Sequence, residues 1–336
     1  MNFYKENAHI IDLTEKEIQI LLKLANQIMG SPSKNPEIFC KQSKILSNQL
    51  PENIKNKLKN FALNGSPTGF LLIKTIPIHY EIIPKTPSSN NNKVGETTIL
   101  ARIQSILINA ISEMISYEAE GYGRLFQDII PIKSMAHNQT SVSSNVELEI
   151  HTEQAFSNLR PDILSLSCLR GDENAFTYIL PIHKIIENVT PEELTLLKQP
   201  LWNCGVDLSF KINGNEFIDG DIRGPFSIIT DISNNEKCND YNLLFDQDLM
   251  IGINDDANNM IKKIVNIYYK ERISHNLKSG EIILVDNRRA VHGRSPFMPK
   301  YDGNDRFLIR CFATFDYDKS KYARINNNRN ILAIYS

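Results

Sequence analysis

The residues best suited to chemistry are His151 and Glu153, which are separated by a single threonine. In an extended segment, side chains two positions apart point to the same side, so one metal ion could contact both. His292, in the stretch DNRRAVHGRSPF, follows the predicted strand EIILVD and is the best candidate for a third ligand. Two imidazoles and one carboxylate on one face leave neighbouring coordination positions open, which suits non-haem iron(II).

Arg306 lies 14 residues after His292, at the start of the predicted strand RFLIRCFATF. A buried arginine beside a metal could hold the remote carboxylate of a dicarboxylic acid through two parallel hydrogen bonds, which a lysine could not do. The keto-acid end of such a molecule would chelate the iron through the open positions. The ordinary alternative for Arg306 is an exposed charge at the end of a strand.

Two stretches, HTEQAFSNLRPDILSLSCLR from residue 151 and DNRRAVHGRSPFMPKYDGNDRFLIR from residue 286, carry a resemblance to a known family. Together they resemble the clavaminate synthase-like branch of the iron(II)- and 2-oxoglutarate-dependent oxygenases, in the TauD/TfdA superfamily. The resemblance covers roughly residues 66–316. It implies that His151, Glu153 and His292 bind Fe(II), and that 2-oxoglutarate and O2 are co-substrates. It also implies hydroxylation of an unactivated C–H bond of an L-amino acid or a close derivative.

The same resemblance implies roles for further residues near the co-substrate. Arg306 and Thr177 would contact a carboxylate of 2-oxoglutarate. Arg310 matches a second arginine, which in relatives meets a carboxylate of either the co-substrate or the amino acid. The ordinary alternative for Thr177, in the stretch NAFTYIL, is a residue of a strand without a binding role.

Substrate contacts are also implied by the resemblance. Asp246, in LLFDQDL, matches an acidic residue that faces the side chain of the substrate, and Asp248 could reinforce it. Glu120 lies where relatives place a polar contact to the amino acid. Two carboxylates would favour a cationic side chain, so arginine or lysine is the expected substrate. The ordinary alternative for Asp246 is a carboxylate that caps a turn or helix.

The elements around these residues suggest an α+β fold. Helical spacing predicts helices from Glu15, near Pro51 and over 99–114, whereas short apolar and alternating runs predict strands at 69–73, 164–168, 225–231, 281–286 and 306–315. Further helices are predicted after Thr190 and over 255–274, and Asn213-Gly214 indicates a hairpin. We expect one oxygenase domain over 1–336: a helical part over about 1–120, a double-stranded β-helix (jelly-roll) core over about 121–320, and a lid over about 215–260.

Composition excludes few classes of protein, but it bears on the expected partners and cellular location. The net charge of −2 gives no reason to expect nucleic acid as a partner, and no apolar run is long enough for a membrane-spanning helix. The start of the chain lacks the pattern of a signal peptide. The cysteines are scattered, with no CxxC pair: Cys40, Cys168, Cys204, Cys238 and Cys311. We therefore expect a reduced, cytoplasmic protein without disulfides.

Two other functions use the same residues. A zinc hydrolase or cupin-like metalloenzyme could bind its metal through the same three ligands, although Arg306 would then have no purpose. A non-catalytic jelly-roll could bind an amino acid or a partner. The sequence leaves open which amino acid and which carbon are attacked, and whether the product is hydroxylated, desaturated or cyclised. It also leaves open the oligomeric state and whether the substrate is free or tethered to a carrier.

Overall fold

The computed structural model describes residues 9–74, 76–78, 83–207, 210, 221–232 and 240–335. The helices of this part are α1 (Glu15–Ala25), α2 (Pro36–Ser47), α3 (Glu52–Asn64), α4 (Ile99–Asn109), α5 (Ile182–Glu187), α6 (Pro191–Leu197) and α8 (Asp255–Glu271). Short 3-10 helices include η2 (Gly95–Thr97), η3 (Gly121–Gly123), η4 (Lys133–Met135), η5 (Asp318–Ala323), η6 (Ile325–Asn327) and η7 (Ala333–Tyr335). None of the described helices is long and apolar enough to cross a membrane.

Two sheets form the centre of the molecule. The larger sheet has the order β1-β2-β14-β6-β16-β3-β17, with β4 also paired to β16, and the smaller has the order β13-β7-β15-β5. The strands of the larger sheet are β1 (Ile10–Asp12), β2 (Phe70–Lys74), β3 (Glu113–Tyr117), β4 (Gln127–Ile129), β6 (Ile163–Arg170), β14 (Ile282–Asp286), β16 (Phe307–Thr314) and β17 (Asn330–Ile331). Those of the smaller are β5 (Leu148–His151), β7 (Thr177–Pro181), β13 (Ile273–His275) and β15 (Ala290–Arg294).

Apolar side chains from both sheets meet between them. Leu166 and Phe312 from the larger sheet share one buried cluster with Ile179 and Ala290 from the smaller. Because side chains alternate along a strand, Arg310 lies on the same face of β16 as Leu308 and Phe312 and also enters this space. The predicted jelly-roll core flanked by helices is thus confirmed.

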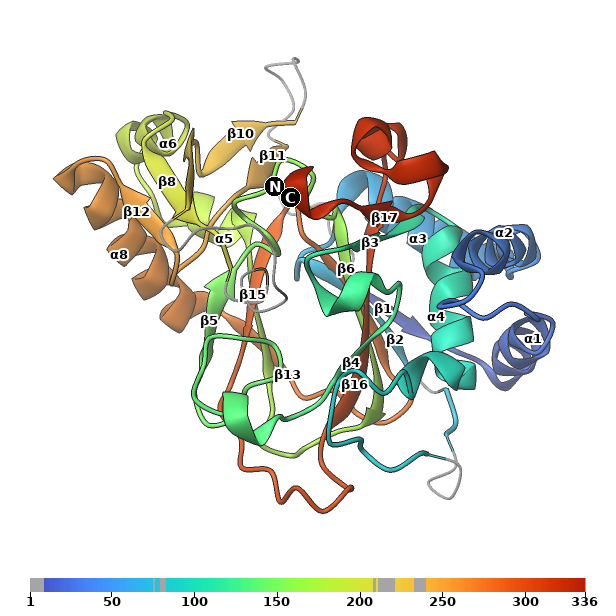
Figure 1. Cartoon of the computed structure of the whole chain (residues 1–336). Coiled ribbons are helices and arrows are strands. Elements are labelled where there is room, and N and C mark those ends of the chain that lie inside the picture. Colours follow the sequence, from blue (N-terminus) through green and yellow to red (C-terminus); the bar gives the residue numbers. More distant parts are fainter. Residues whose placement is uncertain are drawn as a thin grey trace.

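The helices cover the outer sides of this pair of sheets (Figure 1). On one side, α1–α4 pack on the larger sheet through a cluster that includes Leu21, Phe39 and Ile106. On the other side, α8 packs with β8 (Trp202–Gly205) and β12 (Met250–Gly252) around Trp202. The remaining strands of that side are β9 (Ile222–Phe226), β10 (Ile229–Asp231) and β11 (Tyr241–Leu243).

Most of the predicted elements are present, but the strand predicted over 225–231 is split into β9 and β10, and other elements also differ. The predicted helix over 99–114 ends at Asn109, because Met114 pairs instead with Ala313 in the antiparallel β3–β16 ladder. The alternation of serine with apolar residues in β6 is typical of a strand with one exposed face. However, Ser165 and Ser167 are also buried, because Gln104 of α4 covers them and hydrogen-bonds to both. Helices α2 and α5 were not predicted, nor were several short strands, among them β1, β3, β8 and β15. The Asn213-Gly214 hairpin lies outside the described residues.

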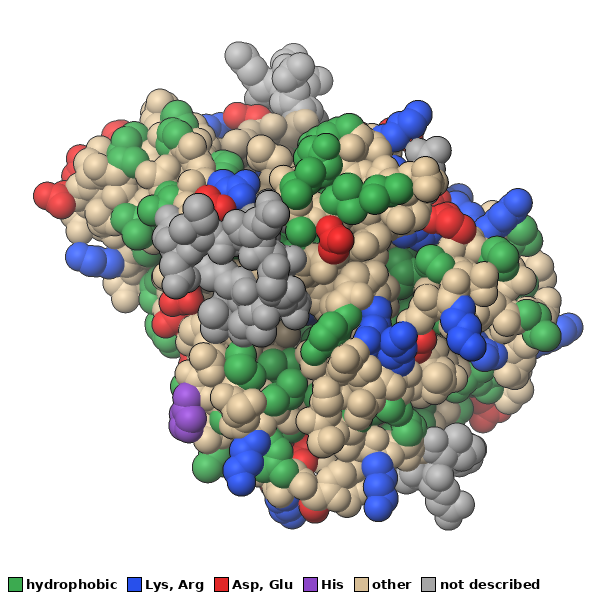
Figure 2. Space-filling model, viewed as in Figure 1, with side chains coloured by type: hydrophobic (Ala, Val, Ile, Leu, Met, Phe, Trp, Pro, Cys, Tyr) green, Lys and Arg blue, Asp and Glu red, His purple; other side chains and the backbone are tan. Residues whose placement is uncertain are grey.

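Charged side chains of both signs are spread over the surface (Figure 2). On the face shown, neither sign forms a continuous field over the elements. This distribution agrees with the small net charge of −2.

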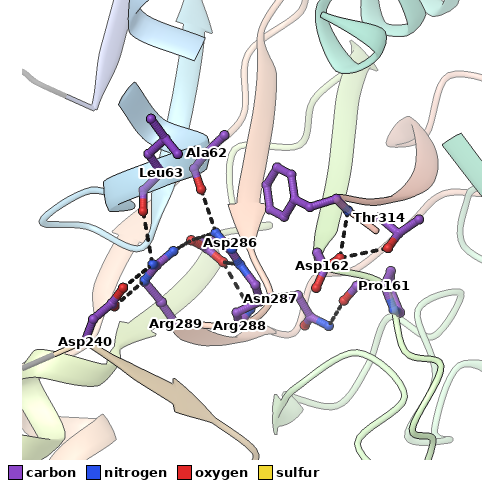
Figure 3. A network of polar contacts seen from close by, with 11 residues as sticks. Ala62, Leu63, Pro161, Asp162, Asp240, Asp286, Asn287, Arg288, Arg289 and Thr314 are labelled. Carbon is purple, nitrogen blue, oxygen red and sulfur yellow. Dashed lines mark hydrogen bonds and ion pairs between the residues drawn. The ribbon is translucent and has the colours of Figure 1, made fainter. Parts of the chain in front are cut away.

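A buried ionic network fixes the turn between β14 and β15 (Figure 3). Asp286, only 1% exposed, accepts hydrogen bonds from Arg288 at 3.0 Å and from Arg289 at 2.8 Å. Arg289 also pairs with Asp240 at 2.7 Å, and both arginines donate to carbonyls at the end of α3. The network therefore ties the turn to a helix that is more than 200 residues away in sequence.

We expect Asp286→Ala to lower the free energy of unfolding by about 3–5 kcal/mol, because it leaves two partly or fully buried guanidinium groups without their shared carboxylate. Urea denaturation followed by circular dichroism measures this change. The control is Asp231→Ala, which removes a surface pair with Lys198 and is expected to cost less than about 1 kcal/mol. Equal effects of the two substitutions would contradict the structural role given to Asp286.

Candidate metal centre and substrate pockets

The pairing of β5 with β15 brings the first predicted ligands together. His151 and His292 are direct partners in this antiparallel ladder, and their ring centres lie 4.5 Å apart. Glu153 follows β5 and places a carboxylate oxygen 3.5 Å from Nε2 of His292. One possible ligand atom from each of the three residues lies within 4.8 Å of the others. The geometry therefore fits one metal ion bound by two imidazoles and a carboxylate.

The nitrogen atoms of His151 are arranged as a metal ligand requires. Its Nδ1 donates to the carbonyl of Glu149 at 2.8 Å, and because a carbonyl only accepts, the proton sits on Nδ1. Nε2 is then left with a free lone pair for a metal, and the second nitrogen fixes the orientation of the ring. In His292, Nδ1 is buried without a hydrogen-bond partner in the described structure, whereas Nε2 lies 3.5 Å from the carboxylate of Glu153.

The charges around Glu153 and His292 favour metal binding. For His151, burial lowers the pKa, but Glu153 and Asp246 outweigh it and raise the pKa. Burial raises the pKa of Glu153, but Arg310 and the two imidazoles outweigh it and hold the pKa at about 2. Burial and the neighbouring His151 lower the pKa of His292 to about 4. At neutral pH the carboxylate is therefore ionised and this imidazole is neutral, which are the forms that bind metals.

Asn287 fixes the backbone of Glu153. Its side-chain oxygen accepts from the amide of Glu153 at 2.7 Å, and its nitrogen donates to the carbonyls of Glu153 at 3.2 Å and Pro161 at 2.8 Å. Asn287 is buried in the turn between β14 and β15, next to Asp286. No sequence pattern distinguishes Asn287 as a site residue, because an asparagine beside an aspartate is common in turns.

A pocket that we call the Arg306 pocket lies beside the three ligands. It is lined by Thr177, His292, Arg306 and Arg310 together with apolar side chains such as Leu166. Arg306 is 6% exposed, and no carboxylate of the described residues forms an ion pair with it. Burial lowers the pKa of Arg306 to about 10, so the side chain stays cationic at neutral pH. A buried cation without an anion suits a dicarboxylate ligand.

Arg310 lies between this pocket and the substrate side. It forms ion pairs with Glu120 and, at 3.4 Å, with Glu153, and its Nε donates to Gln127 at 2.9 Å. Burial raises the pKa of Glu120 to about 7, although Arg310 lowers it. The structure thus brings Arg310 and Glu120 into contact beside the metal-ligand candidate Glu153.

A second pocket, which we call the acidic pocket, lies on the other side of the metal ligands. Glu149, Asp246 and Asp248 line it together with His151. Oδ1 of Asp246 accepts the backbone amides of Asp248 at 3.0 Å and Leu249 at 2.8 Å, so this carboxylate also caps a turn. Burial raises the pKa of Asp246 to about 7, against the opposing effect of His151. The binding and capping interpretations of Asp246 are therefore compatible.

Glu149 is a site residue that we did not predict. It lies two positions before His151 on β5, so its side chain is on the same face of the strand as that ligand. Burial raises its pKa, and the nearby Asp248 raises it further. The signal was present in the sequence, since the alternation that relates His151 to Glu153 extends back to Glu149.

We expect Asn287→Ala to weaken iron(II) binding by about 10- to 100-fold, because the backbone of Glu153 loses both of its side-chain hydrogen bonds. Competition with a metal chelator measures the affinity, and circular dichroism reports whether the variant is folded. The matched control is Asn276→Ala, which removes two similar bonds to the carbonyls of Asp172 and Ala175. A folded Asn287→Ala protein that binds iron as tightly as the control would refute this positioning role.

Comparison with known proteins gives relatives over nearly the full length. The sequence is 41% identical to an L-lysine 3-hydroxylase of Catenulispora acidiphila, over 98% of this chain and 91% of that protein. It is 25% identical to an L-asparagine oxygenase of Streptomyces coelicolor over 94% of this chain and 91% of that protein. It is 27% identical to clavaminate synthase 2 of Streptomyces clavuligerus over 91% of this chain and 92% of that protein.

Solved structures share the fold, and a family pattern matches part of the chain. Asparagine oxygenase in complex with Fe(II), 2S,3S-3-hydroxyasparagine and succinate has a TM-score of 0.87 at 24% identity, over 96% of this chain and 99% of that one. The iron oxygenase OrfP in complex with Fe and alpha-ketoglutaric acid has a TM-score of 0.83 with the same identity and coverage. The pattern of the "Taurine catabolism dioxygenase TauD, TfdA family" matches residues 228–312. The chain therefore belongs to the TauD/TfdA family of iron(II)- and 2-oxoglutarate-dependent oxygenases.

Proposed function

We propose that this enzyme hydroxylates free L-lysine at carbon 3, with Fe(II) as cofactor and 2-oxoglutarate and O2 as co-substrates. The observation that carries the choice of substrate is the acidic pocket beside the metal centre. Within the described part of the chain, no Lys or Arg forms an ion pair with Glu149, Asp246 or Asp248. Three carboxylates in one pocket leave a negative charge that a cationic side chain would balance.

The ammonium group of lysine suits the geometry of these acids. Oδ1 of Asp246 already accepts two backbone amides, whereas the carboxylates of Glu149 and Asp248 accept no hydrogen bond from the residues that the structure describes. An ammonium has three N–H donors and needs acceptors on different sides. Glu149 from β5 and Asp248 from the turn after β11 approach the pocket from two separate elements.

The other end of the amino acid would lie at Arg310. This guanidinium borders both pockets, and the N–H of Nη1 that does not point to Glu153 could donate to the α-carboxylate. Glu120, which also lines the acidic pocket, would accept from the α-ammonium. The two charged ends of lysine would then fix the carbons between them beside the metal ligands.

In this assignment His151, Glu153 and His292 would hold the iron, and Arg306 with Thr177 would hold the remote carboxylate of 2-oxoglutarate. Bound Fe(II) supplies the activation of O2, coupled to oxidation of 2-oxoglutarate to succinate and carbon dioxide. The protein orients the two co-substrates on open positions of one metal face. Apolar residues of the Arg306 pocket, among them Leu164 and Leu308, exclude water from that side.

The relatives support lysine and carbon 3. The protein with 41% identity is an L-lysine 3-hydroxylase, whereas the L-lysine 4-hydroxylase of Chitinophaga pinensis is 27% identical. A zinc hydrolase, the alternative raised by the ligand set, would have no use for the buried Arg306. The intact ligand set and family membership likewise disfavour a non-catalytic binding protein. Free lysine, and not a carrier-tethered form, is our proposal for the substrate.

The test is turnover by the iron-loaded protein with 2-oxoglutarate and one amino acid at a time: L-lysine, L-ornithine, L-arginine, L-asparagine and norleucine. We expect succinate to form fastest with L-lysine, together with a product heavier by one oxygen atom. Nuclear magnetic resonance then locates the new hydroxyl group. Stimulation by asparagine or norleucine, with none by lysine, would overturn the proposed substrate while leaving the enzyme class intact.

We expect Glu149→Gln to lower kcat/KM for L-lysine by about 10- to 100-fold, mainly through KM, because a charged hydrogen bond of ~1.5–3 kcal/mol is lost. The KM for 2-oxoglutarate is expected to stay unchanged. Glu147→Gln is the matched control, since Glu147 pairs with Arg272 at 3.1 Å and does not line the acidic pocket. Equal lysine kinetics for the two variants would remove Glu149 from the site.

A further inference from the structure

A third cavity, which we call the outer cavity, is not used by the proposed reaction. It has a volume of about 300 Å³ and adjoins the other two pockets, because Arg310 and Ser141 line all three. Glu120 and Thr140 border both this cavity and the acidic pocket. The outer cavity therefore lies directly beyond the point where the α-carboxylate of lysine would bind.

Two buried polar groups in the wall of this cavity have no hydrogen-bond partner in the described structure. They are Nε2 of Gln127 and Oγ1 of Thr140. The orientation of the Gln127 amide is fixed, because Arg310 only donates and its Nε and Nη2 atoms both contact Oε1. Nε2 of Gln127 is thus a donor that does not face Arg310. Leaving a buried donor without an acceptor costs about 1–3 kcal/mol.

The backbone beside Gln127 is shaped to admit this side chain. Gly121 has a φ of +58°, in the left-handed region, and a Cβ at this position would clash with the Gln127 side chain. The absence of a side chain at Gly121 therefore leaves room for the Gln127 amide in the wall of the cavity. The polar lining is a built feature of the fold, and its two unpaired groups are complementary to a ligand that can both accept and donate.

We propose that the enzyme also hydroxylates lysine whose carboxyl group is joined in an amide bond, as in the first residue of a short peptide. This inference rests on the proposed function and extends it to a second class of substrate. The lysyl carbonyl oxygen would accept from Arg310, and the following residue would occupy the outer cavity. Its amide N–H would donate to Thr140, and its carbonyl or carboxylate would accept from Nε2 of Gln127.

The chemistry of the two unpaired groups favours an amide over a thioester to a carrier. An amide offers an N–H donor and a C=O acceptor. A thioester has no N–H at this position, so it could not donate a hydrogen bond to the hydroxyl of Thr140. The hydroxylation is the same as on free lysine: a C–H bond becomes C–OH, 2-oxoglutarate is oxidised to succinate, and the amide bond stays intact.

The experiment compares L-lysine with L-lysylglycine on iron-loaded enzyme, measuring succinate and the mass of each product. Two variants locate the dipeptide. Ser134→Phe places a ring in the outer cavity from η4, and the matched control Lys133→Phe adds the same ring at the adjacent exposed position, which does not line it. We expect both substrates to gain one oxygen. Ser134→Phe should lower kcat/KM for lysylglycine by about tenfold or more while leaving lysine within about twofold.

The outcomes separate the two proposals. Turnover of lysine without turnover of lysylglycine would overturn the inference and leave the proposed function standing, with water alone filling the outer cavity. Equal loss of both substrates in Ser134→Phe, or equal loss of lysylglycine in the Lys133→Phe control, would also overturn it. Turnover of neither substrate would overturn the proposed function itself.

Discussion

The site depends on the antiparallel pairing of β5 with β15. This ladder sets His151 opposite His292, so two ligands that are 141 positions apart in sequence become direct neighbours. A shift of one residue would turn one imidazole to the other face of the sheet, because side chains alternate along a strand. The smaller sheet is held against the larger by the apolar cluster between them. Packing of that cluster therefore fixes the register on which metal binding depends.

Charge is distributed around the metal ligands in an ordered way. Arg306 lines the pocket on one side, and Arg310 lies between the two pockets and is paired with Glu120 and Glu153. Within the described residues, Glu149, Asp246 and Asp248 of the acidic pocket form no ion pair with a lysine or arginine. A dicarboxylate and a cationic amino acid would complement these two sides separately. Under the proposed function, the two sides would distinguish 2-oxoglutarate from the lysine side chain by the sign of their charge.

Local sequence patterns predicted much of the fold and the candidate ligands. Apolar periodicity identified α1, α3, α8 and the main strands, and the resemblance to the oxygenase family joined His151, Glu153, His292 and Arg306 in one centre. The patterns failed where a partner far along the chain decides the outcome. Met114 fits the helical pattern of the sequence, but in the structure it pairs with Ala313 of β16. Asn287 and the outer cavity depend on side-chain contacts between distant segments, which no local pattern specifies.

The turn from Asp286 to Arg289 joins two roles in four consecutive residues. Asp286 and the arginines connect it to α3, while Asn287 secures the backbone of Glu153. Contiguous segments tend to unfold locally as one cooperative unit. The hydrogen bonds of these four residues are therefore expected to break together. A fluctuation that frees the helix contact would therefore also release the carboxylate. Iron binding and the contact between this turn and α3 are thus thermodynamically linked. Free iron(II) would therefore stabilise the packing of α3 by mass action, although α3 does not contact the metal centre.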